Sequence, residues 1–192
     1  MKTENAVLMQ MARNSLKNKW GLAIGTCVVY FVILSIVQMI PAAGPIVSLI
    51  IAGPLTLGLI LFSLSISRGK EARFGQLFHG FDHFGPSLVT YLLVALYTFL
   101  WTLLLIVPGI IASFSYSMSL YILADDPSIT GSEAIHKSKE MMNGNKGKLF
   151  CLHLRFLGWI LLGILSLGIG FLWIIPYMQI SIANFYNDLK KD

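Results

Sequence analysis

Charged residues are scarce in this chain. Asp, Glu, Lys and Arg together make up 12% of the 192 residues, while hydrophobic residues make up 56% and the mean hydropathy is +0.74. Soluble domains average about 25% charged residues, so the composition excludes an ordinary soluble protein and predicts a membrane protein. A chain of this length has room for one bundle of spans of about 20 residues each. We therefore expect a single transmembrane domain over residues 1–192.

Cysteine, histidine and acidic residues are also few, which limits the chemistry open to the chain. There are two Cys, four His and nine Asp or Glu residues. Cys27 and Cys151 both lie in apolar runs, so they predict no disulfide framework. Nucleophilic catalysis needs a nucleophile beside an oriented base, and metal hydrolysis needs three converging ligands. No glycine loop of the phosphate-binding kind is present. We expect no enzyme, with no catalytic residue, cofactor or metal.

One pair of histidines has the spacing of metal ligands. His79 and His83 are four residues apart, with Asp82 between them, and two such side chains on one helical face can hold a metal. The pattern is short and lacks a second ligand cluster. We expect two solvated histidines at the membrane interface, and the sequence does not reveal their role.

Long apolar runs are what the chain has in abundance. Two prolines at 41–45, Val-Pro-Gly at 107–109 and a glycine-containing stretch at 166–170 interrupt them as turns. These interruptions predict an all-α, polytopic membrane helix bundle of six transmembrane helices in three hairpins. The predicted spans cover residues 20–40, 46–67, 87–107, 110–123, 149–167 and 171–186.

The distribution of basic residues predicts the orientation. None of the fourteen Lys and Arg residues lies in the three turns, so the positive-inside rule places both termini in the cytoplasm. We expect a multi-pass protein of the cell membrane. The net charge of +5 favours contact with anionic lipid headgroups over contact with nucleic acid.

Short cytoplasmic helices are expected between the spans. Residues 3–19 have helical spacing on a basic background, and residues 74–84 carry a face of aromatic residues; both patterns are typical of helices lying at the membrane surface. The longest polar stretch, residues 124–150, contains a third. Thr130 and Glu133 form a capping box there, and Asn143 with Gly144 marks the end of the helix.

This third helix, residues 131–143, is the first candidate site. Its apolar and polar residues separate onto two faces, so it is either a basic connector or a docking surface for a partner or a lipid headgroup. The docking hypothesis depends on six residues: Glu133, Ile135, Lys137, Ser138, Lys139 and Met142.

The second candidate site is a polar path between the fourth, fifth and sixth spans. The fourth span is rich in hydroxyl groups, which either line a cavity or let helices pack closely. Arg155 is the one strong charge within a span. It either pairs with Asp125, Asp126 or the polar face of the sixth span, or reaches the headgroups. The path would use four residues: Tyr116, Arg155, Gln179 and Asn184.

Several stretches resemble a known family. They are ARNSLKNKW at 12–20, LFHGF at 77–81, LLIVPGII at 104–111, SEAIHKSKEMMNGNK at 132–146, FLGW at 156–159, PY at 176–177 and NFY at 184–186. Together they resemble the domain of unknown function 975 family of bacterial integral membrane proteins. There is also a more distant likeness to the membrane-embedded part of some glycerophosphodiester phosphodiesterases. The resemblance implies a six-span membrane protein and brings no catalytic residue.

Two functional hypotheses remain open. The first is a non-enzymatic membrane module that binds a membrane-protein partner, a second copy of itself or lipid at its cytoplasmic face. The second is a transporter or channel for a small solute, with its path along the polar residues named above.

Overall fold

The computed structural model describes residues 3–190, and within that range the protein contains helices and no strands. Five helical segments are long and apolar enough to cross a membrane: Trp20–Gln38, Gly44–Ser67, Phe74–Leu104, Ile106–Asp125 and Lys146–Leu165. The predicted all-α membrane bundle is therefore confirmed. The sixth predicted span is also helical, at Phe171–Leu189, but it is not among these five. Its amides and Asp188 make it less apolar than the others.

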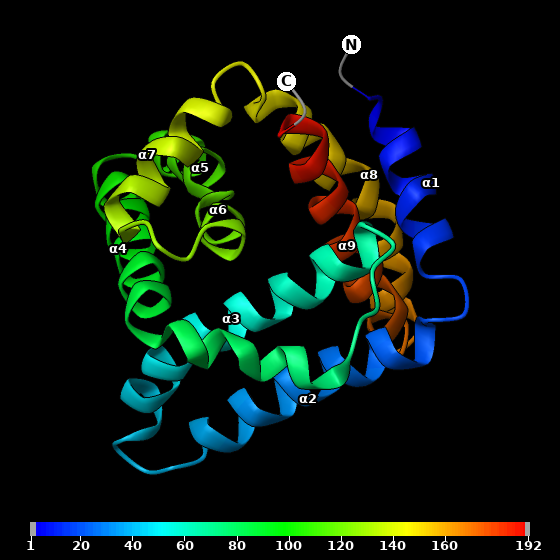
Figure 1. Ribbon diagram of the computed structural model, residues 1–192, viewed down its shortest axis with the longest axis horizontal. Helices are drawn as coiled ribbons and strands as arrows, with labels where there is room; N and C mark the ends of the chain where they lie inside the picture. The colour runs from blue at the N-terminus through cyan, green and yellow to red at the C-terminus, as the bar shows by residue number, and fades with distance from the viewer. Residues whose placement is uncertain (1–2, 191–192) are drawn as a thin grey trace.

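The helices follow one another through short connections (Figure 1). In chain order they are α1 (Asn5–Ser15), α2 (Trp20–Gln38), α3 (Gly44–Ser67), the 3₁₀ helix η1 (Phe74–His83), α4 (Phe84–Leu104), α5 (Ile106–Tyr116), α6 (Ser119–Asp125), α7 (Gly131–Met141), α8 (Lys146–Leu165) and α9 (Phe171–Leu189).

Helix α3 forms the centre of the bundle. It contacts α1, α2, α4, α6, α9 and η1. Of the residues in its most apolar 18-residue stretch, 61% are buried, against 17% in α2 and 11% in the segment Phe74–Leu104. Its small residues allow this close packing, since they let neighbouring backbones approach. At Gly58 an added Cβ would lie 1.9 Å from the carbonyl oxygen of Leu77 on η1. Only glycine fits there.

The aromatic stretch at 74–84 is helical as predicted, although most of it is a 3₁₀ helix. Leu77 is buried against α3, while Phe74, Phe78, Phe81 and Phe84 are each 38–43% exposed. The inward face is thus a leucine and a glycine fitted to α3, and the aromatic rings point away from the bundle.

Two details of the predicted fourth span are wrong. The turn lies at Leu105, which is extended, and not at 107–109; Pro108 sits in the first turn of α5, where a proline costs no hydrogen bond. The span is also divided, because α5 ends at Tyr116 and α6 begins at Ser119. At the break, the backbone N–H of Met118 donates to the hydroxyl of Ser138 on α7 at 3.2 Å. A contact distant in sequence thus replaces a helical hydrogen bond.

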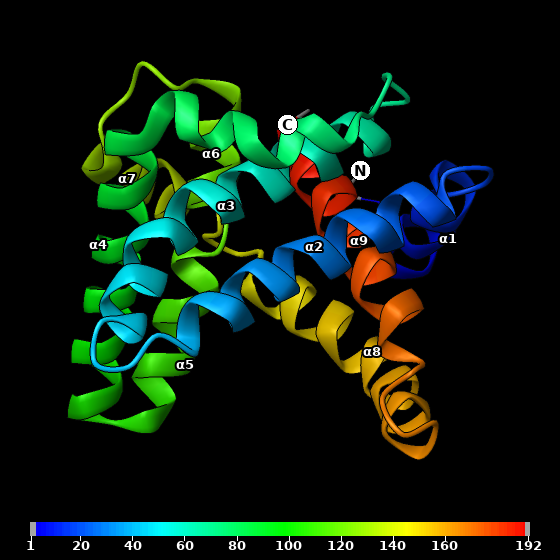
Figure 2. The ribbon, with the colours of Figure 1, turned by 90° about the horizontal axis from the view of Figure 1, so that it is seen from below.

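The bundle has two limbs that extend from its centre. We call α4 with α5 the first limb and α8 with α9 the second. Figure 1 shows them on opposite sides of the molecule, with α3 running between them. In Figure 2 the turns at the tips of the two limbs lie in the lower part of the view, and the loops that follow α3 and α6 lie in the upper part. Arg68 directly follows α3 and Asp125 is the last residue of α6. We call this end, with the ion-paired residues Lys148, Asp188 and Lys190, the polar end.

Candidate functional site

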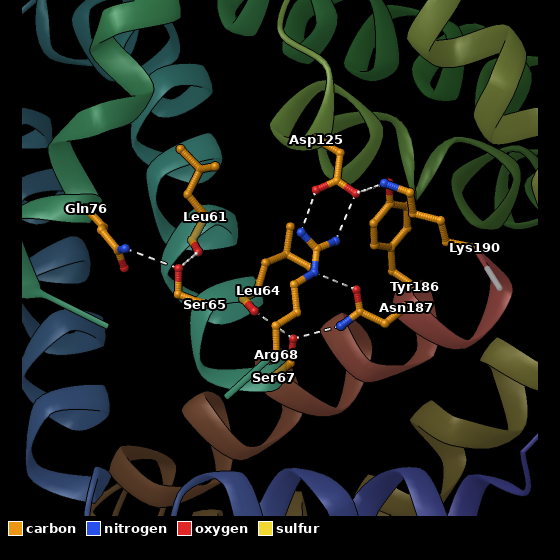
Figure 3. A network of polar contacts seen from close by, with 10 residues as sticks. All are labelled: Leu61, Leu64, Ser65, Ser67, Arg68, Gln76, Asp125, Tyr186, Asn187 and Lys190. Carbon is orange, nitrogen blue, oxygen red and sulfur yellow. Dashed lines mark hydrogen bonds and ion pairs between the residues drawn. The ribbon is translucent and has the colours of Figure 1, made fainter. Parts of the chain in front are cut away.

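The polar end is held together by an ion network around Asp125, the last residue of α6. The guanidinium group of Arg68, just after α3, donates to both carboxylate oxygens of Asp125 at 2.7 and 2.8 Å. Lys190 donates to the same carboxylate at 2.6 Å, and the hydroxyl of Tyr186 donates at 3.0 Å. Figure 3 shows these groups converging from three segments. One carboxylate therefore joins α3, α6 and α9.

The network continues along α9. The Nε of Arg68 donates to the Asn187 side-chain oxygen at 3.0 Å, and the Asn187 amide donates to the Ser67 hydroxyl at 2.9 Å. Hydrogen bonding to Asp125 raises the pKa of Arg68 above its ordinary value. Arg68 thus stays charged, and its planar group is fixed by two acceptors.

A second ion pair lies nearby. Lys148 of α8 donates to Asp188 of α9 at 2.7 Å, and the backbone N–H and hydroxyl of Thr3 also donate to Asp188. Burial acts to raise the pKa of Asp188, but the hydrogen bonds from Lys148 and Thr3 lower it below the ordinary value. Asp125 and Asp188 are therefore ionised, and each links helices at the polar end.

Sequence reasoning missed this arrangement. It considered Arg155 as the partner of Asp125 or Asp126, but Arg155 is exposed and has no hydrogen-bond or ion-pair partner within residues 3–190. The pairing of Arg68 with Asp125 could have been inferred from the predicted topology. Arg68 follows the second span and Asp125 ends the fourth, and both ends lie on the same side of the membrane in the predicted topology.

The predicted helix of residues 131–143 is α7, and its capping box is present. The carboxylate of Glu133 accepts from the N–H of Thr130 at 2.8 Å, and the Thr130 hydroxyl accepts from the N–H of Glu133 at 3.3 Å. Gly144 has a φ of +73°, the left-handed conformation that ends helices.

The six predicted docking residues are divided between the two faces of α7. Ile135, Ser138 and Met142 are buried against the bundle, while Glu133, Lys137 and Lys139 are exposed. The hydroxyl of Ser138 also donates to the carbonyl of Ser115 on α5 at 2.8 Å. The apolar face therefore attaches α7 to α5 and α6, and the charged face is exposed.

A groove runs along α5 beside Lys139 and Lys146. Its volume is about 230 Å³. Trp101 and Pro108 line it near the tip of the first limb, and Lys139 and Lys146 line it near the polar end. Neither lysine has an ion-pair partner within the described residues. The groove is thus apolar along its length and positively charged at one end.

A larger cavity, of about 640 Å³, lies between the two limbs, and Tyr116 lines both this cavity and the groove. Tyr116 and Gln179 of the predicted polar path line the cavity. Asn184 does not; it is buried near α1, where its amide makes a long contact of 3.5 Å with the carbonyl of Leu8. Arg155 does not line it either. The structure thus brings two of the four path residues together.

The histidine pair has few neighbours. His79 is exposed and His83 half-buried. Within residues 3–190, no three His, Cys, Asp or Glu side chains come together in a group that could hold a metal.

Comparison with known proteins gives one positive finding. No curated protein and no solved structure matches this chain. A family model does match, over residues 1–112 and again over residues 102–192, so that the two matches together cover the whole sequence. The chain therefore belongs to the family described as "Protein of unknown function (DUF975)".

Proposed function

We propose that this protein is a non-enzymatic membrane module that binds anionic phospholipid at its polar end, which faces the cytoplasm. The observation that carries the proposal is the groove along α5. Lys139 and Lys146 lie at one end of the groove. The remaining lining is mostly apolar and consists of Trp101, Pro108, Ile111, Ala112, Ser115 and Tyr116. A phospholipid has the matching distribution, with a negative phosphate at one end and an acyl chain beyond it.

The charges of the two lysines set the expected preference for an anionic headgroup. A basic residue near an anionic membrane surface contributes about 1 kcal/mol of attraction, so two lysines contribute about 2 kcal/mol, or roughly a 30-fold preference for an anionic over a neutral headgroup. Salt lowers this preference because the lysines are near the surface.

The fixed position of α7 supports the proposal. Because Ile135 and Ser138 hold the helix against the bundle, Lys139 is presented in one place and not on a mobile loop. The acidic residues of the polar end support a non-enzymatic role, since Asp125 and Asp188 are both occupied by structural partners.

The test uses charge reversal with a matched control. The double variant Lys139→Glu, Lys146→Glu reverses the two groove charges. The control variant Lys17→Glu, Lys70→Glu makes the same charge change at two exposed lysines that do not line the groove. Both variants are placed in vesicles of phosphatidylcholine with a photoreactive phosphatidylglycerol.

The groove variant is expected to lose most of its crosslinking to the anionic lipid, while the control keeps the wild-type level. Equal losses in both variants would mean that net charge alone attracts the lipid, and the groove site would be rejected. If instead a copurifying protein, or a second copy of this chain, is lost with the groove variant while lipid labelling is unchanged, the ligand is that protein.

The second candidate function is the passage of a small solute through the cavity between the limbs, and the presence of Tyr116 and Gln179 in its lining favours it. Liposomes that contain the protein would take up the solute, and Gln179→Ala would abolish uptake without unfolding the protein. Arg155→Ala serves as the control because Arg155 lies outside the cavity.

A further inference from the structure

The cavity between the limbs has a mostly apolar lining that also carries uncharged polar groups. Among residues 3–190, eight hydroxyl-bearing residues, one amide and one imidazole line it, and no Asp, Glu, Lys or Arg does. The hydroxyl-bearing residues are Tyr30, Thr56, Tyr91, Thr98, Thr102, Tyr116, Ser117 and Tyr121.

Several of these polar groups have nothing to bond to. Thr98 Oγ1 is buried and has no hydrogen-bond partner. The hydroxyls of Tyr91 and Tyr116 and the amide of Gln179 likewise have none within residues 3–190. Other lining groups are occupied; for example, the Thr102 hydroxyl donates to the carbonyl of Thr98 at 2.8 Å. Since an unpaired polar group away from water is destabilising, these groups favour a ligand that pairs with them.

Buried aromatic side chains border the cavity toward the polar end. Tyr121, which lines it, is only 4% exposed, and its ring packs on Tyr186 with centroids 5.4 Å apart. On the side where the limbs meet, the ring of Phe114 contacts Phe150 and His153 with centroids 6.0 and 5.8 Å apart. Aromatic rings therefore border the cavity on both of these sides.

Toward the tips of the limbs the surroundings are apolar and open. Figure 2 shows the two limbs diverging in the lower part of the view. Phe99 and Leu103 on α4 are 63% and 73% exposed, and Leu161 on α8 is 57% exposed. In a bilayer these side chains contact acyl chains, so this opening of the cavity is accessible to lipid.

We infer that the cavity binds an uncharged membrane lipid of the diacylglycerol type, whose hydroxyl and ester groups pair with Thr98, Tyr91, Tyr116 and Gln179. A volume of about 640 Å³ is in the range of ligand sites. A charged headgroup is disfavoured inside because it would be desolvated without a partner of opposite charge. The hydroxyl of the lipid both donates and accepts, as does the amide of Gln179, and its ester carbonyls accept from the tyrosine and threonine hydroxyls.

The experiment compares two photoreactive lipids with the same acyl chains, a diacylglycerol and a phosphatidylglycerol, in phosphatidylcholine nanodiscs that contain the full chain. Crosslinked peptides are identified by mass spectrometry. Ala95→Phe fills the cavity from α4, whereas Leu100→Phe enlarges an exposed residue of the same helix that does not line it. Thr98→Val removes the unpaired hydroxyl at nearly constant volume, with Thr26→Val as its control on α2, where the hydroxyl already donates to Leu22.

The diacylglycerol probe is expected to label peptides of α4, α6 and α9 that line the cavity. Ala95→Phe should abolish this labelling and Leu100→Phe should leave it intact. Thr98→Val should weaken binding about fivefold, the equivalent of one hydrogen bond, and Thr26→Val should have no effect.

Three outcomes would overturn the inference: uniform labelling of all lipid-exposed helices, equal labelling of the cavity by the phosphatidylglycerol probe, or no response to Ala95→Phe. The result is independent of the groove proposal. Reversal of Lys139 and Lys146 should change phosphatidylglycerol labelling along α5 and leave diacylglycerol labelling in the cavity unchanged, so failure of one site is distinguishable from failure of the other.

Discussion

Replacement of Asp125 by Asn is the strongest test of how the polar end is held together. Asn keeps the shape of the side chain but removes the charge that Arg68 and Lys190 share. The side chain of Asp125 is 11% exposed and that of Arg68 is 28% exposed, so their pair lies between two known limits. Exposed pairs contribute about 0.2–1 kcal/mol, and loss of one partner of a fully buried pair costs about 3–5 kcal/mol.

We therefore expect Asp125→Asn to lower the free energy of unfolding by about 1–3 kcal/mol. Lys190→Ala is the internal comparison. Its side chain is 54% exposed, so its removal should cost at most about 1 kcal/mol. Arg68→Lys should fall between the two, because lysine keeps the charge and loses the two parallel hydrogen bonds and the contact with Asn187.

The measurement is reversible unfolding of the purified protein in mixed detergent micelles, followed by circular dichroism. The order of the losses matters more than their size. If Asp125→Asn costs no more than Lys190→Ala, Asp125 is not the junction of three segments, and this account of the polar end is refuted.

Two further predictions concern other contacts. Gly58→Ala should destabilise the protein by about 1–3 kcal/mol, because the new methyl group would overlap the carbonyl of Leu77, whereas Gly75→Ala, with open space around it, should not; thermal unfolding of the two variants checks this. The stabilisation from Asp188 and Lys148 should be present above pH 3.8, the ordinary pKa of the carboxyl group, and be lost as the pH falls through the lower value in the folded protein. The difference in unfolding free energy between wild type and Asp188→Asn should therefore narrow below that pH, and a constant difference would exclude an ionic contribution.

The sequence predicted the helices well because their signals are local. Apolar runs and prolines placed α2, α3 and α8 to within a few residues, and the capping box at Thr130 identified the start of α7 correctly. The break between α5 and α6 was not predictable in this way. It depends on the hydroxyl of Ser138, twenty residues away from the N–H of Met118 that it accepts from.

The candidate sites were harder to predict for the same reason. The hydroxyl groups of the fourth span were visible in the sequence, but their side of the helix and the empty volume beside them depend on how far the two limbs diverge. Arg155 was considered because it is a charge within a predicted span. The arginine that forms an ion pair with Asp125 is instead Arg68, 57 residues away in sequence. Pairings over such separations are set by tertiary packing and leave no pattern in a single sequence.

The network around Asp125 also has a mechanical consequence. It fastens α3, α6 and α9 at one end of the molecule, while the tips of the two limbs lie apart at the other (Figure 2). Any relative movement of the limbs is then a rotation about this fixed point, with the largest displacement at their tips. Asp125 would then be the fixed point of this rotation. A small change there would produce a larger change in the distance between the tips of the two limbs.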